Sequence, residues 1–224
     1  MFTQIYSIQT VEEALGCVEA GADRIGVLVG TPGGKFPCAI HEEEAEKIFE
    51  ALKGKAVRVL ISVADNERDI LDQTKRLHPD VLHLCANFTG SPEFREKMRQ
   101  EIPDVLLMEA VGIVDESAVE DAKAKAEYAD ILILDSVSKT VPGVGAAGET
   151  HDWSIDKAIV DAVNIPVILA GGLGPDNVED AIRAVHPAGV DSLTKPSIKE
   201  NGILLRKDLE KVREFCTRAK AMEM

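Results

Sequence analysis

The chain is short of positive charge. It carries 25 Lys and Arg residues against 39 Asp and Glu residues, which gives a formal net charge of −14. This balance argues strongly against nucleic acid or an acidic membrane surface as a partner, because both require a basic face. It leaves an anionic small substrate open, because helix N-termini and a few local cations can hold a phosphate group against an unfavourable global field.

Paired cysteines, metal-ligand spacings and long apolar runs are also missing. Cys17, Cys38, Cys85 and Cys216 are scattered without a CxxC pair, as is typical of reduced thiols in a cytosolic protein. No apolar run approaches the roughly 20 residues of a membrane span, and the N-terminus lacks the basic start of a signal peptide. The glycines of 143–148 follow Pro142 and open no helix directly, so they do not support a dinucleotide site. We expect a cytoplasmic protein without membrane partner, metal or other cofactor.

What the chain does contain is a regular alternation of apolar runs and amphipathic segments. The expected strands are 2–8, 24–29, 56–63, 81–85, 105–111, 131–135, 167–170 and 189–193. The expected helices are 11–20, 41–52, 67–77, 92–100, 117–128, 155–163, 177–185 and 206–219. This alternation predicts a parallel sheet with helical crossovers, and a doubly wound sheet is the competing arrangement. The count of eight and the late glycine turns favour one (β/α)₈ TIM barrel over residues 1–224.

Two expected strands end in residues suited to chemistry. The apolar run 131–135 closes on Asp135, whose carboxylate then sits at the tip of a buried parallel strand. The run 167–170 is followed by Gly171 and Gly172 and then by a helix opening near Asn177. In such barrels, a strand followed by a tight glycine turn and the start of a helix binds a phosphate through backbone N–H groups. Asp135 would otherwise be a helix cap or a loop hydrogen-bonding residue.

Other candidates lie at or after the carboxyl ends of the strands, where barrel enzymes place their chemistry. They are Tyr6, Lys35, Cys85, Glu109, Thr194 and Lys195. Tyr6 alternates with Gln4, so both are expected to point into the barrel, where tyrosine serves either packing or chemistry. Glu109 interrupts an apolar strand and is either a structural ion-pair member or a site residue. Cys85 shares a strand face with His83, and a small apolar filler is its favoured role.

At these residues the chain resembles the phosphoribosylanthranilate isomerases of tryptophan biosynthesis. Asp135 looks like the general acid of that family's sixth strand, and the stretch from Gly145 and Gly148 to Asp152-Trp153 looks like its GGTGxxFDW loop. Residues 169–178 look like LAGGLxPxNV, and residues 187–191 look like PxGVD. The resemblance extends over nearly the full chain. It implies a phosphate site at Gly171, Gly172, Thr194 and Lys195, and a substrate site that includes Lys35, Cys85, Gly145 and Gly148.

The departures from the family pattern fall at the chemistry. Tyr6 stands in the register of the family's cysteine base, Cys38 in that of its carboxylate-binding arginine, and Glu109 in that of its fifth-strand lysine. Lys195 replaces a glycine that faces the phosphate. The changes suggest an altered substrate. Lys35 is the nearest cation to the missing arginine.

The implied reaction is an Amadori rearrangement, in which an acid protonates the ribose ring oxygen and a base removes the C2 proton. Asp135 fits the acid role. Tyr6, with an ordinary pKa of about 10, is a poor base unless a cation such as Lys195 lowers its pKa, and Glu109 or Cys85 would be the substitutes.

We therefore expect an isomerase of a phosphorylated sugar, present as a monomer or homodimer. A phosphate-ligand-binding barrel without isomerase activity is one alternative. A phosphosugar epimerase or an aldolase, the latter with Lys195 as the Schiff-base amine, is another.

Overall fold

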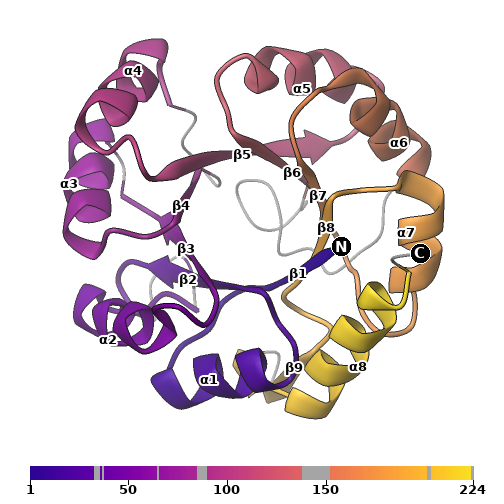
Figure 1. Ribbon diagram of the computed structural model, residues 1–224, viewed down its shortest axis with the longest axis horizontal. Coiled ribbons are helices and arrows are strands. Elements are labelled where there is room, and N and C mark those ends of the chain that lie inside the picture. The colour runs from indigo at the N-terminus through magenta and orange to yellow at the C-terminus, as the bar shows by residue number, and fades with distance from the viewer. Residues whose placement is uncertain are drawn as a thin grey trace.

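A computed structural model describes residues 1–32, 36, 38–64, 66–84, 90–137, 152–200 and 203–222. Eight parallel strands of these residues form a closed barrel in sequence order, with helices outside it (Figure 1). The strands are β1 (Phe2–Ile5), β2 (Arg24–Val29), β3 (Val57–Ser62), β4 (Val81–Leu84), β5 (Leu106–Ile113), β6 (Ile131–Ser136), β7 (Val167–Leu169) and β8 (Gly189–Ser192). Pairing of β1 with β8 closes the ring, so the (β/α)₈ prediction is confirmed and the doubly wound alternative is wrong.

The helices follow the strands in the expected rhythm. They are α1 (Val11–Glu19), α2 (Glu42–Leu52), α3 (Glu67–Leu77), α4 (Pro92–Glu101), α5 (Ala118–Ala126), α6 (Trp153–Ala162), α7 (Val178–Val185) and α8 (Leu209–Lys220). Side-chain caps fix several of the starts: Thr10, Asn66 and Ser91 each accept a hydrogen bond from a backbone N–H of the first turn. Within the described part of the chain, no helix is long and apolar enough to cross a membrane.

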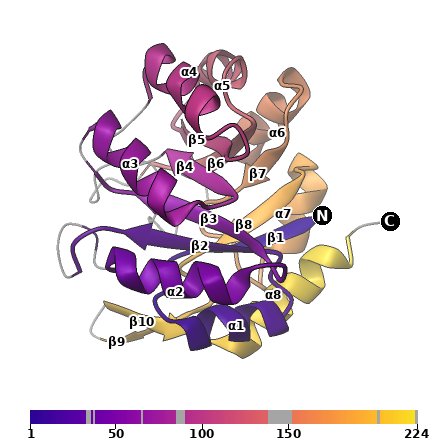
Figure 2. The same cartoon turned by 60° about the vertical axis from the view of Figure 1, so that its left-hand side comes forward.

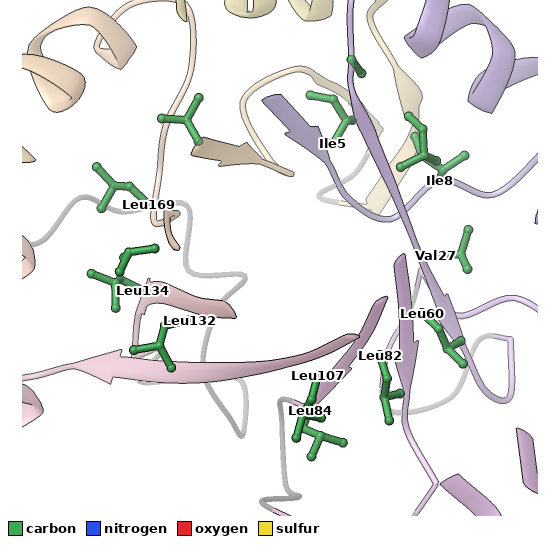
Figure 3. Close-up of a cluster of buried hydrophobic side chains, with 14 of the residues drawn as sticks. Ile5, Ile8, Val27, Leu60, Leu82, Leu84, Leu107, Leu132, Leu134 and Leu169 are labelled. Atoms are coloured by element: carbon green, nitrogen blue, oxygen red, sulfur yellow. The ribbon is translucent and has the colours of Figure 1, made fainter. Parts of the chain in front are cut away.

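The core has two layers, because successive side chains of a strand point to opposite faces. Outward-facing side chains such as Leu107, Leu132 and Leu134 pack in the larger cluster between strands and helices. Figure 3 shows these and related side chains distributed around the ring of strands. Inward-facing side chains such as Met108 and Ile133 fill the barrel itself. This alternation decides which polar side chains reach the interior.

One element departs from the expected pattern. A two-stranded antiparallel hairpin, β9 (Ser197–Glu200) and β10 (Ile203–Lys207), follows β8 and lies beside α1 (Figure 2). The helix expected from Arg206 instead begins at Leu209, with Asp208 as its N-cap. The ammonium of Lys207 is buried and donates to Leu193 O at 2.8 Å and to Ser197 Oγ at 2.9 Å, which ties the hairpin to the end of β8.

Candidate active site

A small pocket of about 40 Å³ opens where β1, β6, β7 and β8 end. Five of the residues singled out from the sequence line it: Tyr6, Asp135, Gly171, Gly172 and Thr194. The remaining lining residues are Leu173, Asp191, Ser192 and Leu193. Closure of the barrel therefore joins the first strand to the sixth, seventh and eighth at one mouth.

Asp135 reaches this pocket because of the alternation along β6. Ile131 and Ile133 belong to the cluster inside the barrel, whereas Leu132 and Leu134 belong to the outer cluster. Asp135 continues the inward series at the carboxyl end of the strand, and it is half-buried. Its Oδ1 accepts a hydrogen bond from Ser136 N at 2.7 Å, which anchors the carboxylate beside its own backbone.

The glycine turn after β7 has the geometry of a phosphate seat. Gly171 and Gly172 have φ of 84° and 64°, a left-handed conformation that glycine adopts without a Cβ penalty. Asn177 secures the loop, since its Oδ1 accepts from Gly174 N at 2.9 Å and its Nδ2 donates to Gly172 O at 3.1 Å. Helix α7 begins at the next residue, Val178. The unpaired N–H groups of a helix start favour an anion there.

Tyr6 points into the barrel, as its alternation with Gln4 predicts. Its side chain is 4% exposed, and its Oη lies 2.5 Å from Nδ1 of His83 on β4. Burial lowers the pKa of His83 to about 3, so the imidazole is neutral near pH 7. His83 was expected to share a strand face with Cys85 but had no predicted role, because its separation from Tyr6 along the chain carries no signal of this contact.

Asp191 is a second carboxyl group at the pocket that sequence reasoning did not assign. It faces inward from β8, and its Oδ1 accepts from Gln4 Nε2 at 3.1 Å across the β1–β8 seam. Burial first, and then the negative charge of Asp135, raise the pKa of Asp191 well above its ordinary value. The sequence could have identified Asp191. It alternates with Gly189 and Leu193 on the inward face of β8, and an aspartate on that face of a closed barrel is buried.

Glu109 is a correction. It alternates with Leu107 and Val111, both in the outer cluster, so its side chain faces helix α4 and not the pocket. Its Oε1 accepts from Nε and Nη2 of Arg95 on that helix at 3.1 and 2.7 Å. Burial raises the pKa of Glu109, while the charge of Arg95 opposes that rise. Of the two roles left open by the sequence, the structure supports the ion pair.

Lys195 follows Thr194 after the end of β8. It is absent from the pocket lining, and its Nζ lies 2.8 Å from Oδ2 of Asp176 near the start of α7. The Lys195 ammonium holds the pKa of Asp176 below its ordinary range. The Lys195 ammonium is directed toward Asp176, and its expected contact with a phosphate stays a prediction from the sequence. Thr194, one residue earlier, does line the pocket.

Four predicted substrate contacts, Lys35, Cys85, Gly145 and Gly148, lie outside the described residues. Their roles stay predictions from the sequence. Cys38, in the register of the missing arginine, is described: it is half-buried, burial raises the pKa of its thiol, and Ser7 hydrogen-bonds to it. A protonated thiol offers no positive charge to a carboxylate ligand.

Comparisons with known proteins identify the family that this chain resembles. Residues 4–218 match the family model of N-(5'-phosphoribosyl)anthranilate (PRA) isomerase. The N-(5'-phosphoribosyl)anthranilate isomerase of Methanocella arvoryzae is 31% identical over 212 residues, which cover 95% of this chain and 94% of that protein.

Solved structures give the same result. The phosphoribosyl anthranilate isomerase of Thermotoga maritima has a TM-score of 0.80 at 28% identity, with 99% of both chains covered. A phosphoribosyl anthranilate isomerase in complex with reduced 1-(o-carboxyphenylamino)-1-deoxyribulose 5-phosphate has a TM-score of 0.78 at 27% identity, again over 99% of each chain.

Proposed function

This chain belongs to the N-(5'-phosphoribosyl)anthranilate (PRA) isomerase family, and from that membership we propose that it is an aldose–ketose isomerase of a phosphorylated sugar. The observation that carries the proposal is the shared pocket: the carboxylate of Asp135 and the glycine turn at Gly171 and Gly172 face one small space. An acid beside a phosphate seat is the minimum that this chemistry requires, because the phosphate fixes the sugar and the acid meets its oxygen.

The roles follow from position. Gly171 and Gly172, the first turn of α7 and Thr194 bind the phosphate through backbone N–H and hydroxyl groups. Asp135 is the general acid, which gives its proton to the ring oxygen and opens the sugar. This role requires a protonated carboxyl at the moment of reaction.

We further propose that the sugar carries something other than anthranilate. The related structure binds a ligand with a carboxyphenyl group. Here Cys38 provides no cation, and the bulky Tyr6 stands in the register of a small cysteine. The ring of Tyr6 lies so close to Gly26 on β2 that an added Cβ there would be 1.7 Å from Tyr6 Cδ1. The absence of a side chain at Gly26 therefore leaves room for the Tyr6 ring inside the barrel.

A phosphate-ligand-binding barrel without turnover is the second candidate. The substitution of the cysteine base by Tyr6 favours it, because losing a general base costs about 10²- to 10⁴-fold in rate. Aldolase chemistry at Lys195 has less support. A Schiff-base lysine is activated by desolvation or by a second cation, whereas the Lys195 side chain is 38% exposed and is paired with Asp176.

The deciding experiment is hydrogen exchange at carbon. An aldose–ketose isomerase removes and returns a carbon-bound proton, so it introduces deuterium at C1 or C2 of its substrate in D₂O. We would incubate the protein with ribose 5-phosphate, ribulose 5-phosphate and phosphoribosylanthranilate in turn and follow the spectra by NMR. Exchange that disappears in Asp135→Asn supports isomerisation. A ligand that raises the melting temperature but never exchanges favours the binding barrel.

A further inference from the structure

The pocket proposed for the phosphate carries acidic side chains and lacks a basic one among the residues that the structure describes. Asp135 and Asp191 both line it, and no described lysine, arginine or histidine does. Lys195, close to it in the sequence, is directed toward Asp176. A phosphate beside carboxyl groups is favoured only where positive charge lies nearby. A cation is therefore expected just outside the lining.

Lys207, the last residue of β10, is such a cation. Its side chain is only 3% exposed, and its Nζ donates to Leu193 O at 2.8 Å and to Ser197 Oγ at 2.9 Å. Both acceptors are uncharged, and no carboxylate in the described part of the chain forms an ion pair with this ammonium. A buried cation without an opposite charge beside it is costly. This cost makes Lys207 a candidate for a role in binding.

Lys207 is held in place from one side and faces the pocket electrostatically on the other. Its backbone N–H donates to Oε1 of Glu13 on α1. Burial lowers the pKa of the Lys207 ammonium, whereas the charges of Glu13 and of Asp191 raise it. Asp191 lines the pocket, so the ammonium acts on the space that a ligand would occupy. A bound phosphate would favour the charged lysine in the same way.

One peptide group connects this lysine to the pocket. Leu193 and Thr194 line the pocket, and the carbonyl oxygen of Leu193 accepts from Lys207 Nζ and from Ser197 Oγ, neither of which belongs to a lining residue. In a planar trans peptide the N–H points opposite to the C=O. The N–H of Thr194 therefore points away from Lys207, and it donates to no acceptor within the described residues.

We propose that Lys207 is a positioning residue for the phosphate: it holds the peptide between Leu193 and Thr194 with its N–H toward the pocket and places a positive charge behind that peptide. A charged donor on the carbonyl also polarises the N–H of the same peptide and strengthens its bond to an anion. The arrangement exists before the ligand arrives, so little order is lost on binding. The inference rests on the proposed function for the phosphate site but not on isomerisation.

A purely structural role for Lys207 is the competing explanation, because its contacts tie the hairpin to the end of β8. Ser197 takes part in the same tie, since its Oγ donates to Leu193 O and accepts from Lys207. Ser197→Ala weakens the tie but keeps the ammonium. Lys207→Met keeps an unbranched side chain in the buried space but removes the donor and the charge. The two variants therefore separate anchoring of the hairpin from binding of the anion.

The first test is calorimetric titration with inorganic phosphate. We expect Lys207→Met to weaken binding about tenfold and Ser197→Ala to change it by less than about twofold. Lys220→Met is the matched control, because that ammonium also donates to a backbone carbonyl, Gly21 O at 2.8 Å, but pairs with Asp23 just before β2. It should bind phosphate like the native protein. Equal losses in Lys207→Met and Ser197→Ala, or full binding by Lys207→Met, overturn the proposal.

The second test observes the peptide itself by NMR. In protein labelled with ¹⁵N-threonine, Thr194→Ser identifies the Thr194 signal. Saturation with inorganic phosphate should move the Thr194 amide proton downfield in the native protein and in Lys220→Met, and less in Lys207→Met. An unmoved Thr194 signal in native protein that binds phosphate overturns the proposal, as does native protein that binds none.

Folding and turnover are controlled separately. Circular dichroism checks that each variant still folds. Lys207→Arg keeps a charged donor and should bind phosphate more tightly than Lys207→Met; equal weakness of the two, with both folded, contradicts the role of the charge. Inorganic phosphate is not turned over, so intact phosphate binding without deuterium exchange into a phosphosugar would refute the isomerase and leave the role of Lys207 standing.

Discussion

At the scale of single residues, the chemistry depends on how the barrel positions two carboxyl groups. Asp135 is half-buried at the pocket, and Asp191 is fully enclosed beside it. The first carboxyl has access to a ligand, and the second has a raised pKa. Two carboxyl groups whose surroundings differ in this way take different roles, as in other enzymes that use acid catalysis.

Replacement of Asp135 tests the acid directly. Asp135→Asn keeps the shape of the side chain but removes the transferable proton. We expect kcat for the sugar identified by deuterium exchange to fall at least about 10²-fold, with ligand affinity nearly unchanged, because a general acid acts mainly in the transition state. Steady-state kinetics and calorimetry measure the two quantities. An equal loss of binding and turnover would mark Asp135 as an orienting residue instead.

The raised pKa of Asp191 predicts a pH-dependent stability. The folded state binds this proton more tightly than the unfolded state, where the pKa is about 3.9. Stability from this group is therefore complete below pH 4 and is lost as pH rises toward the folded pKa, by up to about 1.4 kcal/mol per pH unit. In thermal unfolding, Asp191→Asn should match the native protein near pH 4 and exceed it increasingly as pH rises toward the folded pKa of Asp191. A constant difference across that range would refute the assignment.

At the scale of elements, the turn between β7 and α7 is the part of the site whose geometry is most demanding. Gly172 has φ of 64°, which β-branched residues hardly adopt, and it lines the pocket in which we propose that the phosphate binds. Gly172→Val should abolish stabilisation by phosphate esters in a thermal shift assay. Gly54, with φ of 69° and open space around it, is the matched control. Gly54→Val carries similar strain and should retain phosphate binding; full binding by Gly172→Val would exclude the turn as the seat.

The ion pair between β5 and α4 is predicted to serve stability alone. The Glu109 side chain is fully buried and that of Arg95 is 11% exposed, so Glu109→Gln leaves a mostly buried guanidinium without its counter-charge. We expect a loss of about 3 kcal/mol in unfolding free energy. We expect kcat to stay within about twofold, because the pair faces away from the pocket. The double variant Glu109→Leu/Arg95→Met should recover stability. A drop in kcat as large as that of Asp135→Asn would restore Glu109 to the site.

These elements also show where sequence reasoning reaches its limit. The barrel rhythm was predictable because each strand and helix is a local pattern. Whether the Glu109 side chain points into the barrel or out toward the helices could not be predicted. Strands of such a barrel are apolar on both faces, so Leu107 and Met108 do not indicate which of them points inward. The hairpin β9–β10 was not predicted, because no expected element covered residues 197–205 and Arg206 was assigned to the last helix.

At the scale of the whole molecule, the site forms only when the ring of strands closes. Some of its contacts join residues far apart in the sequence, and these contacts could not be predicted. Asp135 and the glycine turn each belong to a local motif, so the sequence singled them out. The bonds Tyr6–His83 and Gln4–Asp191 join residues 77 and 187 positions apart. Such pairs have no local pattern, and they exist only because β1 returns to β8 and its tyrosine reaches across to β4.

The whole arrangement predicts weak or no activity on phosphoribosylanthranilate. The resemblance found in the sequence aligns Tyr6, which is bonded to His83, with the family base, and it aligns the neutral Cys38 with the carboxylate-binding arginine. A missing base costs about 10²- to 10⁴-fold in rate, and an unpaired carboxylate weakens binding further. The fluorescence of phosphoribosylanthranilate allows its loss to be followed continuously, with Tyr6→Cys beside the native chain.

We expect the native protein to fall below about 10⁴ M⁻¹s⁻¹ in kcat/KM, the lower end for ordinary enzymes. Tyr6→Cys should gain activity if the acid and the phosphate seat are intact, because it supplies a thiol and vacates the space above Gly26. A native kcat/KM above that limit would show that Tyr6 and Cys38 do not redirect the substrate, and that another group, for which the sequence offers Cys85, removes the proton. The barrel would then be a phosphoribosylanthranilate isomerase that has replaced its base while keeping its acid.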